Sequence, residues 1–432
     1  SENMERVLNG RRGWMKKNCL GLVNNVYFRD TFASLAHRNY RYLWLGQTTH
    51  SGALWIDMVV RPLLVLDLTG SPIHLGMVMA SRALPNIILG VFAGVVADSF
   101  NRRTVLMTTK ILILLISIIF TSLIVLGWIQ LWQIYALTFL RGSTMAFDQP
   151  ARRAIIPSIV PDNLVTNAMA LSSSSIQVMR ILGAGTAGLI IAFSGLEMAF
   201  VAIVCFYAAA LYFTWAMKTP ALQGIGYKGL HSARNSLVEG IRFAFGNSAI
   251  RGVFLIALGY YAFGMTFVSI FAPLFAVEIL GLGSSGLGYL MSVIGFGGVI
   301  GSLCMAAINP VKRGLLLLGV LMVLGGSLIT FSLLSYTGIT VLIFIVAAFI
   351  GVSTAVFLPV ANAILVQAAP ENMRGRVLGL ISLDRGMTTL GGMAAGFLVV
   401  LLGVQVSQIL FGMCCVFSAI ILFSMVPQLK KI

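Results

Sequence analysis

Charged residues are scarce in this sequence. Of its 432 residues, only 10% are Asp, Glu, Lys or Arg, whereas 58% are hydrophobic. Soluble proteins carry roughly 25% charged residues, and a soluble fold of this length would run out of polar residues before it covered so much apolar surface. A lipid bilayer removes that problem because it acts as an apolar solvent. The composition therefore excludes a soluble globular protein and indicates a membrane protein.

Cysteine clusters and catalytic motifs are also missing. The five cysteines form no C-x-x-C pair and the four histidines are equally dispersed, so neither a metal site nor a disulfide framework is indicated. The sequence has no Ser-His-Asp order and no phosphate-binding loop. We therefore expect no enzyme activity, no metal and no cofactor.

Acidic residues are fewer than basic ones, 13 against 29, which gives a formal net charge of +16. Excess basic charge can indicate nucleic-acid binding, but here Lys and Arg gather in short segments between apolar runs. That distribution is typical of the cytoplasmic loops of membrane proteins. We therefore expect a lipid bilayer as a partner, and no nucleic acid.

Apolar runs long enough to cross a bilayer recur along the chain. They predict twelve transmembrane helices in an all-α membrane protein, at residues 43–66, 75–97, 104–127, 131–153, 164–193, 197–217, 252–279, 285–308, 314–336, 340–367, 376–402 and 405–426. We expect five regions: a cytoplasmic arm at 1–42, a six-helix bundle at 43–218, a linker at 219–250, a second bundle at 251–427 and a tail at 428–432. The arm would hold an interfacial helix or be disordered.

The loops that follow the odd-numbered spans contain no Lys or Arg. The opposite loops and both termini are basic, with loop residues that include Arg102, Arg103, Arg152, Arg153 and Lys218. Since basic loops stay in the cytoplasm, both termini are predicted to be cytoplasmic, which requires an even number of spans. We expect a multi-pass protein of a prokaryotic plasma (inner) membrane.

The two halves of the chain resemble each other at a constant offset of about 209 residues. Gly142, Ala146, Pro150 and Pro161 correspond to Gly351, Ala355, Pro359 and Pro370. Two parallel six-helix repeats are a known transporter architecture. The offset therefore supports two bundles of six helices.

Two local motifs carry a family resemblance. The segment from Gly94 through Asp98 to Arg102 and Arg103 is similar to the loop motif of the major facilitator superfamily. The stretch from Phe147 to Arg153, with Arg180-Ile-Leu-Gly183 and Arg374-Gly-Arg376, resembles the enterobactin-exporter and macrolide-efflux branch of that superfamily. The resemblance covers nearly the whole chain after about residue 38.

This resemblance implies the major facilitator fold and alternating-access export of small amphipathic molecules, usually driven by antiport along a proton gradient. The antiporter motif of the fifth span usually reads G-P-x-x-G, whereas this chain has Gly183-Ala184-Gly185 without the proline. The expectation of antiport therefore does not rest on that motif. A small-molecule substrate and a monomeric transporter are expected.

Ionisable residues at membrane depth usually line a cavity or a pathway. In the first span, Gln47, His50, Asp57 and Arg61 fall on one face of a helix. Asp57 and Arg61 can pair because they are four residues apart. The stripe is interpreted as a substrate or proton site, the alternative being a self-neutralised pair that only tolerates burial.

The fourth span repeats this spacing with Arg141, Asp148 and Arg152. We expect a cytoplasmic gate near the membrane surface, made by Asp98, Arg102, Arg103, Asp148 and Arg152. Arg141 lies closer to the midplane. In the second half its counterpart is Ile350, so the fold itself does not require a charge there.

Basic residues outnumber acidic ones inside the membrane, with Arg61, Arg82, Arg141, Arg180 and Arg385 against Asp57 and Asp384. Arg141 and Arg180 are expected to project into a cavity near the midplane, and a positive cavity favours an anionic or electron-rich substrate. The alternative for Arg82 and Arg385 is that they reach to the interface or to backbone carbonyls. The predicted substrate-binding and coupling residues are Gln47, His50, Asp57, Arg61, Arg141, Arg180, Asp384 and Arg385.

Three functions fit these features. The first is proton-coupled export of an amphipathic, possibly anionic, drug- or siderophore-like molecule. The second is a flippase or transporter for a lysophospholipid or another lipid-like anion. The third is a non-transporting membrane sensor built on a transporter scaffold, since a fold alone does not assign a function.

Overall fold

The computed structural model describes residues 32–218, 242–307, 312–370 and 386–425. These ranges are helical and contain no β-strand. The first half comprises η1 (Ala33–Ala36), α2 (Arg38–Thr69), α3 (Pro72–Ser99), α4 (Arg102–Val125), α5 (Leu131–Ile155), η2 (Ile156–Ser158), η3 (Asp162–Leu164) and α6 (Val165–Ala216). The second half comprises α8 (Ser248–Gly259), η4 (Tyr260–Gly264), η5 (Phe267–Phe271), α9 (Ala272–Leu274), η6 (Phe275–Ile279), α10 (Gly283–Ala307), α11 (Arg313–Ser335), α12 (Thr340–Ala368), α14 (Met387–Leu402) and α15 (Val404–Met425).

These elements make twelve passes, as the sequence predicts. The long α6 contains two passes, because Gly195 interrupts it with φ 84° and ψ 175°, a conformation that only glycine adopts without strain. The five segments from α8 to η6 follow one another without a break and form one pass, in which η4, η5 and η6 are π-helical. The all-α fold with twelve transmembrane helices is therefore confirmed.

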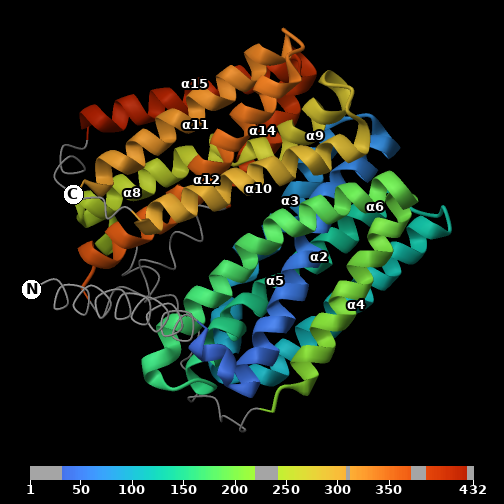
Figure 1. Ribbon diagram of the computed structural model, residues 1–432, viewed down its shortest axis with the longest axis vertical. Coiled ribbons are helices and arrows are strands. Elements are labelled where there is room, and N and C mark those ends of the chain that lie inside the picture. Colours follow the sequence, from blue (N-terminus) through green and yellow to red (C-terminus); the bar gives the residue numbers. More distant parts are fainter. Residues whose placement is uncertain (1–31, 219–241, 308–311, 371–385, 426–432) are drawn as a thin grey trace, which may run out of the picture.

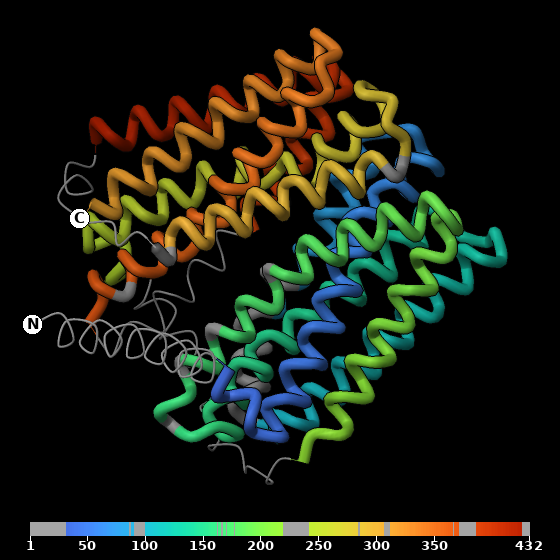
Figure 2. The backbone as a smooth tube through the Cα atoms, in the orientation of Figure 1, coloured from blue at the N-terminus to red at the C-terminus, as the bar shows by residue number. Residues whose placement is uncertain are grey.

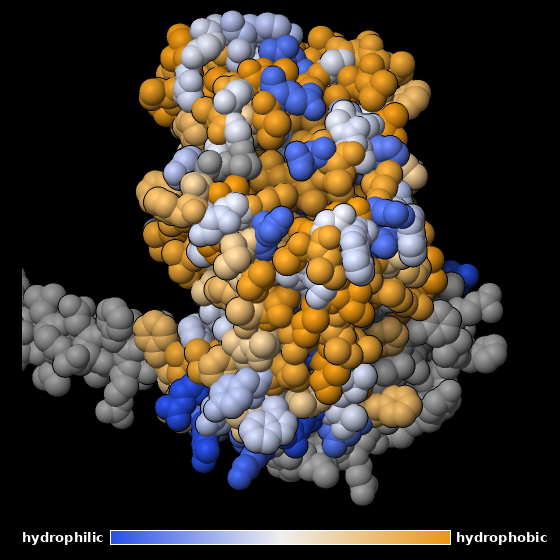
Figure 3. All heavy atoms as spheres, turned by 90° about the vertical axis from the view of Figure 1, so that its right-hand side faces the viewer, coloured by the Kyte–Doolittle hydropathy of each residue, from blue (hydrophilic) through white to orange (hydrophobic). Residues whose placement is uncertain are grey.

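The helices have a surface suited to lipid. Within the described ranges, seven are long and apolar enough to cross a membrane by length and composition alone. Large hydrophobic side chains are exposed all along them, including Phe193 at 85% and Leu303 at 65%. Figure 3 shows one face of the molecule covered largely by hydrophobic residues. In water such a surface would drive aggregation, whereas a bilayer solvates it.

The observed helices extend beyond several predicted spans. The first was predicted at 43–66, and α2 runs from Arg38 to Thr69. The difference arises because polar residues at a membrane surface continue the helix outside the apolar window. Residues 1–31 of the predicted arm, the tail at 428–432 and residues 219–241 of the predicted linker lie outside the described residues, whereas the end of the arm forms η1 and the first turn of α2.

The helices form two bundles, α2 to α6 and α8 to α15 (Figure 1). We call the end at which α2 begins and α15 ends the terminal end, and the opposite end, where α2 meets α3, the far end. The bundles converge at the far end and diverge at the terminal end (Figure 1). They meet mainly where α6 packs on α10, side by side in Figure 2, and where α3 packs on α14.

Glycines let the two bundles approach closely at these contacts. A Cβ added to Gly76 of α3 would lie 2.9 Å from the carbonyl oxygen of Gly392 of α14, and one added to Gly288 of α10 would lie 2.8 Å from the backbone nitrogen of Gly188 of α6. No side chain fits in such a gap. The seam at the far end is therefore closed by backbone packed on backbone, as small residues permit in membranes.

We expect Gly288→Val to prevent this closure, because its side chain collides with the α6 backbone. Spin labels at Glu197→Cys and Thr340→Cys, in a chain without its native cysteines, would report the distance across the far end by double electron–electron resonance. In Gly288→Val, the longer distance, which corresponds to an open far end, should become the dominant one. Gly319→Val is the matched control, since nothing lies within 4 Å of a Cβ added there, and an unchanged distance in Gly288→Val would contradict the assigned seam.

Candidate functional site

The predicted polar stripe of α2 is buried in the first bundle. Gln47 and His50 are each 4% exposed, Asp57 is 1% exposed and Arg61 is 5% exposed. α2 packs mainly against α6, and the Gln47 amide donates to the carbonyl of Ser172 on α6 at 2.9 Å. The spacing of these residues therefore identified a face that is hidden from lipid.

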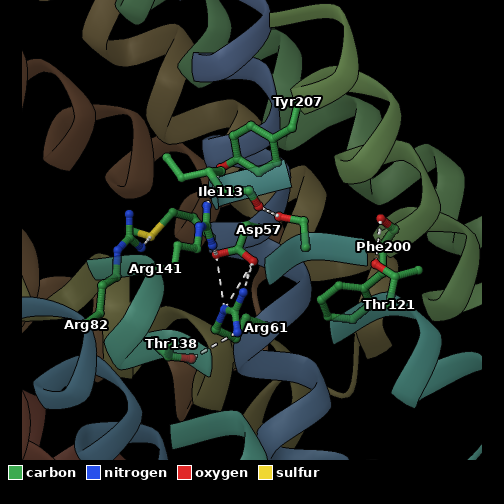
Figure 4. Close-up of polar contacts among 11 residues, drawn as sticks. Asp57, Arg61, Arg82, Ile113, Thr121, Thr138, Arg141, Phe200 and Tyr207 are labelled. Atoms are coloured by element: carbon green, nitrogen blue, oxygen red, sulfur yellow. Dashed lines mark hydrogen bonds and ion pairs between the residues drawn. The ribbon is translucent and has the colours of Figure 1, made fainter. Parts of the chain in front are cut away.

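Asp57 is the centre of a first charge cluster (Figure 4). Arg61, one turn along α2, donates to its carboxylate at 2.5 Å and 3.2 Å, and Arg141 of α5 forms a second ion pair with it. Arg141 also donates to the hydroxyl of Tyr207 at 2.5 Å, and Arg61 to the hydroxyl of Thr138 at 3.0 Å. The predicted Asp57–Arg61 pair is present, and a second guanidinium completes it.

Arg82 of α3 lies beside this cluster. Its Nη1 is 2.7 Å from the sulfur of Met58, and Figure 4 shows Arg82 on the side of Arg141 that faces away from Tyr207 and Thr121. Glycine at position 142 is required here, because a Cβ would meet the backbone of Arg82. Among the residues that the structure describes, the cluster thus brings three arginines close to one carboxylate.

A second charge cluster lies closer to the terminal end. Lys110 of α4 is 4% exposed and pairs with Asp148 of α5 at 2.7 Å, while its Nζ is 3.1 Å from Nδ1 of His50. Asp148 also accepts from the hydroxyl of Thr109 at 3.3 Å and lies 3.6 Å from Arg152. The cluster joins α2, α4 and α5.

The two clusters are in register along two helices. His50 and Asp57 are seven residues apart on α2, as are Arg141 and Asp148 on α5, which separates the two layers by about 10 Å. Tyr207 connects them, because its hydroxyl meets Arg141 while its ring lies edge-on to the ring of His50 at 5.3 Å. The first bundle therefore contains one buried polar column.

A pocket lies between the two bundles. The first bundle lines it with Trp55, Met58, Val59, Arg180 and Ala184, and the second with Met265, Val268, Met291, Ile294 and Thr354. The wall is apolar apart from Arg180 and Thr354. This composition suits a largely apolar molecule with one polar or charged group.

Arg180 is the charged group of this pocket. Its Nη2 is buried without a hydrogen-bond partner among the described residues, and its guanidinium lies 5.9 Å from the ring centre of Trp55. Gly298 of α10 makes room for it, since a Cβ there would lie 3.2 Å from Cζ of Arg180 and closer still to Nη2. A buried donor without a partner is costly, and an anionic group in the pocket would satisfy it.

The structure separates residues that the sequence grouped together. Arg141 and Arg180 were both expected in the central cavity, but only Arg180 lines the pocket. Arg141 turns into the first bundle, where Asp57 and Tyr207 supply its acceptors. Asp384 and Arg385 lie outside the described residues.

The predicted gate residues lie at the terminal end of the first bundle. Arg102 donates to the carbonyl of Ala154 at 2.8 Å, and Arg103 donates to that of Trp215 at 3.0 Å. Asp148 and Arg152 approach each other in the second cluster. The side chain of Asp98 lies outside the described residues.

Sequence reasoning missed Lys110 and Tyr207. Lys110 is a single basic residue within the apolar run 104–127, and a lysine at that depth is itself a signal that could have identified it. Tyr207 gave no such signal, because a tyrosine in a membrane span is ordinary. Its contact with Arg141 depends on how α5 and α6 pack.

Comparison with known proteins places the chain among membrane transporters. Residues 29–432 match the protein family described as transmembrane secretion effector. The chain is 27% identical to the uncharacterized MFS-type transporter YfiS of Bacillus subtilis, over 46% of this chain and only 48% of that protein.

Longer matches link the chain to two transporters with named substrates or roles. It is 24% identical to the staphyloferrin A transporter of Staphylococcus aureus, over 78% of this chain and 84% of that protein. It is also 24% identical to the multidrug efflux pump Tap of Mycolicibacterium fortuitum, over 84% of this chain and 91% of that protein. The fold is similar to the crystal structure of a POT family transporter in complex with 5-aminolevulinic acid. The TM-score is 0.72 and the sequence identity 12%, and the match covers 91% of this chain and 97% of that chain.

Proposed function

The chain belongs to the transmembrane secretion effector family of major facilitator superfamily transporters, and from this premise we propose that it exports an amphipathic, anionic small molecule. Export would proceed by alternating access and be driven by proton antiport. The transported molecule binds in the pocket between the two bundles. Because both walls come from one chain, a monomer is sufficient.

The observation that carries this proposal is Nη2 of Arg180, which is buried without a hydrogen-bond partner in the part of the chain that the structure describes. A buried donor without a partner raises the free energy of the empty pocket, and an anionic ligand would lower it through charge-assisted hydrogen bonds. The surrounding Trp, Met, Val and Ile side chains favour an apolar body on the same ligand. A cation would be repelled by Arg180.

The relatives support this chemistry. The staphyloferrin A transporter is named for a siderophore and Tap for multidrug efflux. Both names are consistent with a pocket that accepts small organic molecules. The pocket of this chain narrows the proposal to molecules with an anionic group.

We place the terminal end in the cytoplasm of a prokaryotic cell with the chain in its inner membrane. Basic residues gather at this end, among them Arg38, Arg41, Arg102, Arg103 and Arg152, whereas Asp67, Glu197 and Glu278 lie towards the far end. Basic residues favour the cytoplasmic side. In that orientation the divergence of the bundles (Figure 1) corresponds to an inward-facing conformation.

Two buried carboxylates are available for coupling to protons, Asp57 in the first cluster and Asp148 in the second. The predicted gate residues Arg102, Arg103 and Arg152 would act at the mouth that opens to the cytoplasm, together with Asp98. Contacts that form only in one conformation give alternating access its two states. Transport would then alternate between opening at the terminal end and opening at the far end.

Transport in proteoliposomes tests the proposal. Candidate substrates come from a growth-inhibition screen in a host that lacks its own efflux pumps, with anionic, neutral and cationic amphiphiles as separate sets. We expect anionic amphiphiles to move, with a proton flux in the opposite direction. Uptake limited to acyl-chain anions would favour the lipid transporter, and the absence of any flux would favour the sensor.

A further inference from the structure

Burial does not distinguish the two charge clusters as candidate proton carriers, because both are buried. They differ in the chemistry of their cations. The two cations on Asp57 are the guanidiniums of Arg61 and Arg141, and guanidinium keeps its proton in proteins. A proton arriving at Asp57 would have to displace two charge-assisted contacts.

The second cluster contains groups that can exchange protons with one another. Lys110 is in contact with an imidazole and a carboxylate at once, at 3.1 Å and 2.7 Å. A buried lysine, unlike an arginine, can lose its proton and become a neutral amine. Since the ammonium group only donates, Nδ1 of His50 is the acceptor when Lys110 is charged.

Four helices contribute the titratable and charged groups around this cluster among the described residues. α2 contributes His50, α4 contributes Lys110, α5 contributes Asp148 and Arg152, and α6 contributes Tyr207. Arg141 lies one layer further into the membrane. The positive charges of Arg152 and Arg141 disfavour a further positive charge here, which makes loss of the Lys110 proton easier.

Asp148 has an alternative partner in position. Its Oδ2 is buried without a hydrogen-bond partner among the described residues, and Arg152 lies 3.6 Å away, one turn along α5. When Lys110 loses its charge, Asp148 loses its nearest cation. A small movement of the Arg152 side chain then shortens its ion pair with Asp148 within α5, and the Lys110–Asp148 contact between α4 and α5 is released.

We propose that Lys110 carries the transported proton, that His50 relays it, and that Asp148 exchanges Lys110 for Arg152 when the proton leaves. One N–H bond breaks at Nζ of Lys110 and one forms at Nδ1 of His50. The imidazolium then releases its Nε2 proton to water at the terminal end. One proton and one positive charge leave the cluster, and uptake reverses these steps.

This inference rests on the proton coupling of the proposed function, and it assigns that coupling to a different residue than Asp57. The described conformation contains the Lys110–Asp148 pair and has diverged bundles at the terminal end. It is therefore the protonated state. Raising the pH should deplete it in favour of a conformer that is closed at the terminal end.

The experiment uses the full chain in lipid nanodiscs and needs no substrate. Spin labels at Asn163→Cys and Lys312→Cys, both exposed at the terminal end of different bundles, report the distance across that end. In this labelled protein, we expect the ratio of long to short distances to fall about tenfold from about pH 6 to about pH 9.

Lys110→Arg keeps the charge and the pairing with Asp148 but cannot release a proton. It should reduce the pH response to less than about twofold, and His50→Gln should do the same because an amide does not ionise. Asp57→Asn, measured at a temperature below its own lowered melting temperature, should keep the full response. Melting temperatures within a few degrees of the parent would show that the Lys110→Arg and His50→Gln proteins are folded.

The outcomes separate this inference from the proposed function. A parental pH response in Lys110→Arg overturns the inference. If Asp57→Asn alone removes the response, the coupling of the proposed function stands with Asp57 as its proton carrier, and the assignment to Lys110 is wrong. A distance that does not change with pH in the parent protein overturns the inference, whereas the proposed function would be overturned by the absence of substrate and proton flux in proteoliposomes.

Discussion

Arg180→Gln should reduce transport of an anionic substrate by roughly 10- to 100-fold, since a hydrogen bond to a charged group contributes about 1.5–3 kcal/mol and about 1.4 kcal/mol corresponds to tenfold. The glutamine retains a donor but no charge. Arg180→Lys should lose less transport activity than Arg180→Gln, because its ammonium group keeps the positive charge. It should still transport less than the parent, because it lacks the planar fork of a guanidinium. Initial rates at several substrate concentrations in proteoliposomes measure the effect.

Gly298→Ala provides a second test that leaves the charge in place. Its methyl group would displace the Arg180 guanidinium, so we expect a smaller loss in apparent affinity with little change in maximal rate. Gly326→Ala on α11 is the matched control, because nothing lies within 4 Å of a Cβ added there. Equal transport by Arg180→Gln and the parent protein would point to a neutral or cationic substrate.

Asp57→Asn should lower stability sharply. Removing one partner of a buried ion pair costs about 3–5 kcal/mol, and here two guanidiniums lose their common acceptor. Asn recovers part of this because its carbonyl oxygen still accepts one hydrogen bond. Thermal unfolding in detergent, followed by native tryptophan fluorescence, should show a lower midpoint for Asp57→Asn than for the parent.

Transport by Asp57→Asn separates the two roles that the sequence left open. For a pair that holds α2 against α5, the surviving folded protein should still accumulate substrate in response to a pH gradient. For a coupling site, it should exchange substrate but lose accumulation. We expect the first result, and loss of accumulation at full exchange would contradict it. Asp57→Glu, which keeps the charge, is the control.

Much of the fold could be predicted because membrane helices are specified locally. Each pass needs its own apolar run, so the runs counted in the sequence are the passes observed, including the break at Gly195. Helical spacing also placed His50, Asp57 and Arg61 on one buried face. These properties depend on one helix at a time and are readable from consecutive residues.

The partners of the buried charges could not be predicted in the same way. Whether Arg141 turns towards Asp57 or towards the pocket depends on how α5 rotates against α2, and sequence spacing does not determine that rotation. The contact between Lys110 and Asp148 joins residues on different helices. The same limitation hid Tyr207, whose hydroxyl acquires its role only from the packing of α6.

The seam of glycines at the far end has a thermodynamic consequence for the transport cycle. Backbone packed on backbone orders no long side chains and brings no charges together, so closing the far end costs little rotamer entropy. Because no charges meet at this seam, the equilibrium between its open and closed forms should be almost independent of ionic strength. The terminal end instead carries exposed basic residues such as Arg38 and Arg41, and added salt screens the repulsion between such charges. Salt should thus change the two halves of the cycle unequally, slowing or speeding the terminal-end step alone.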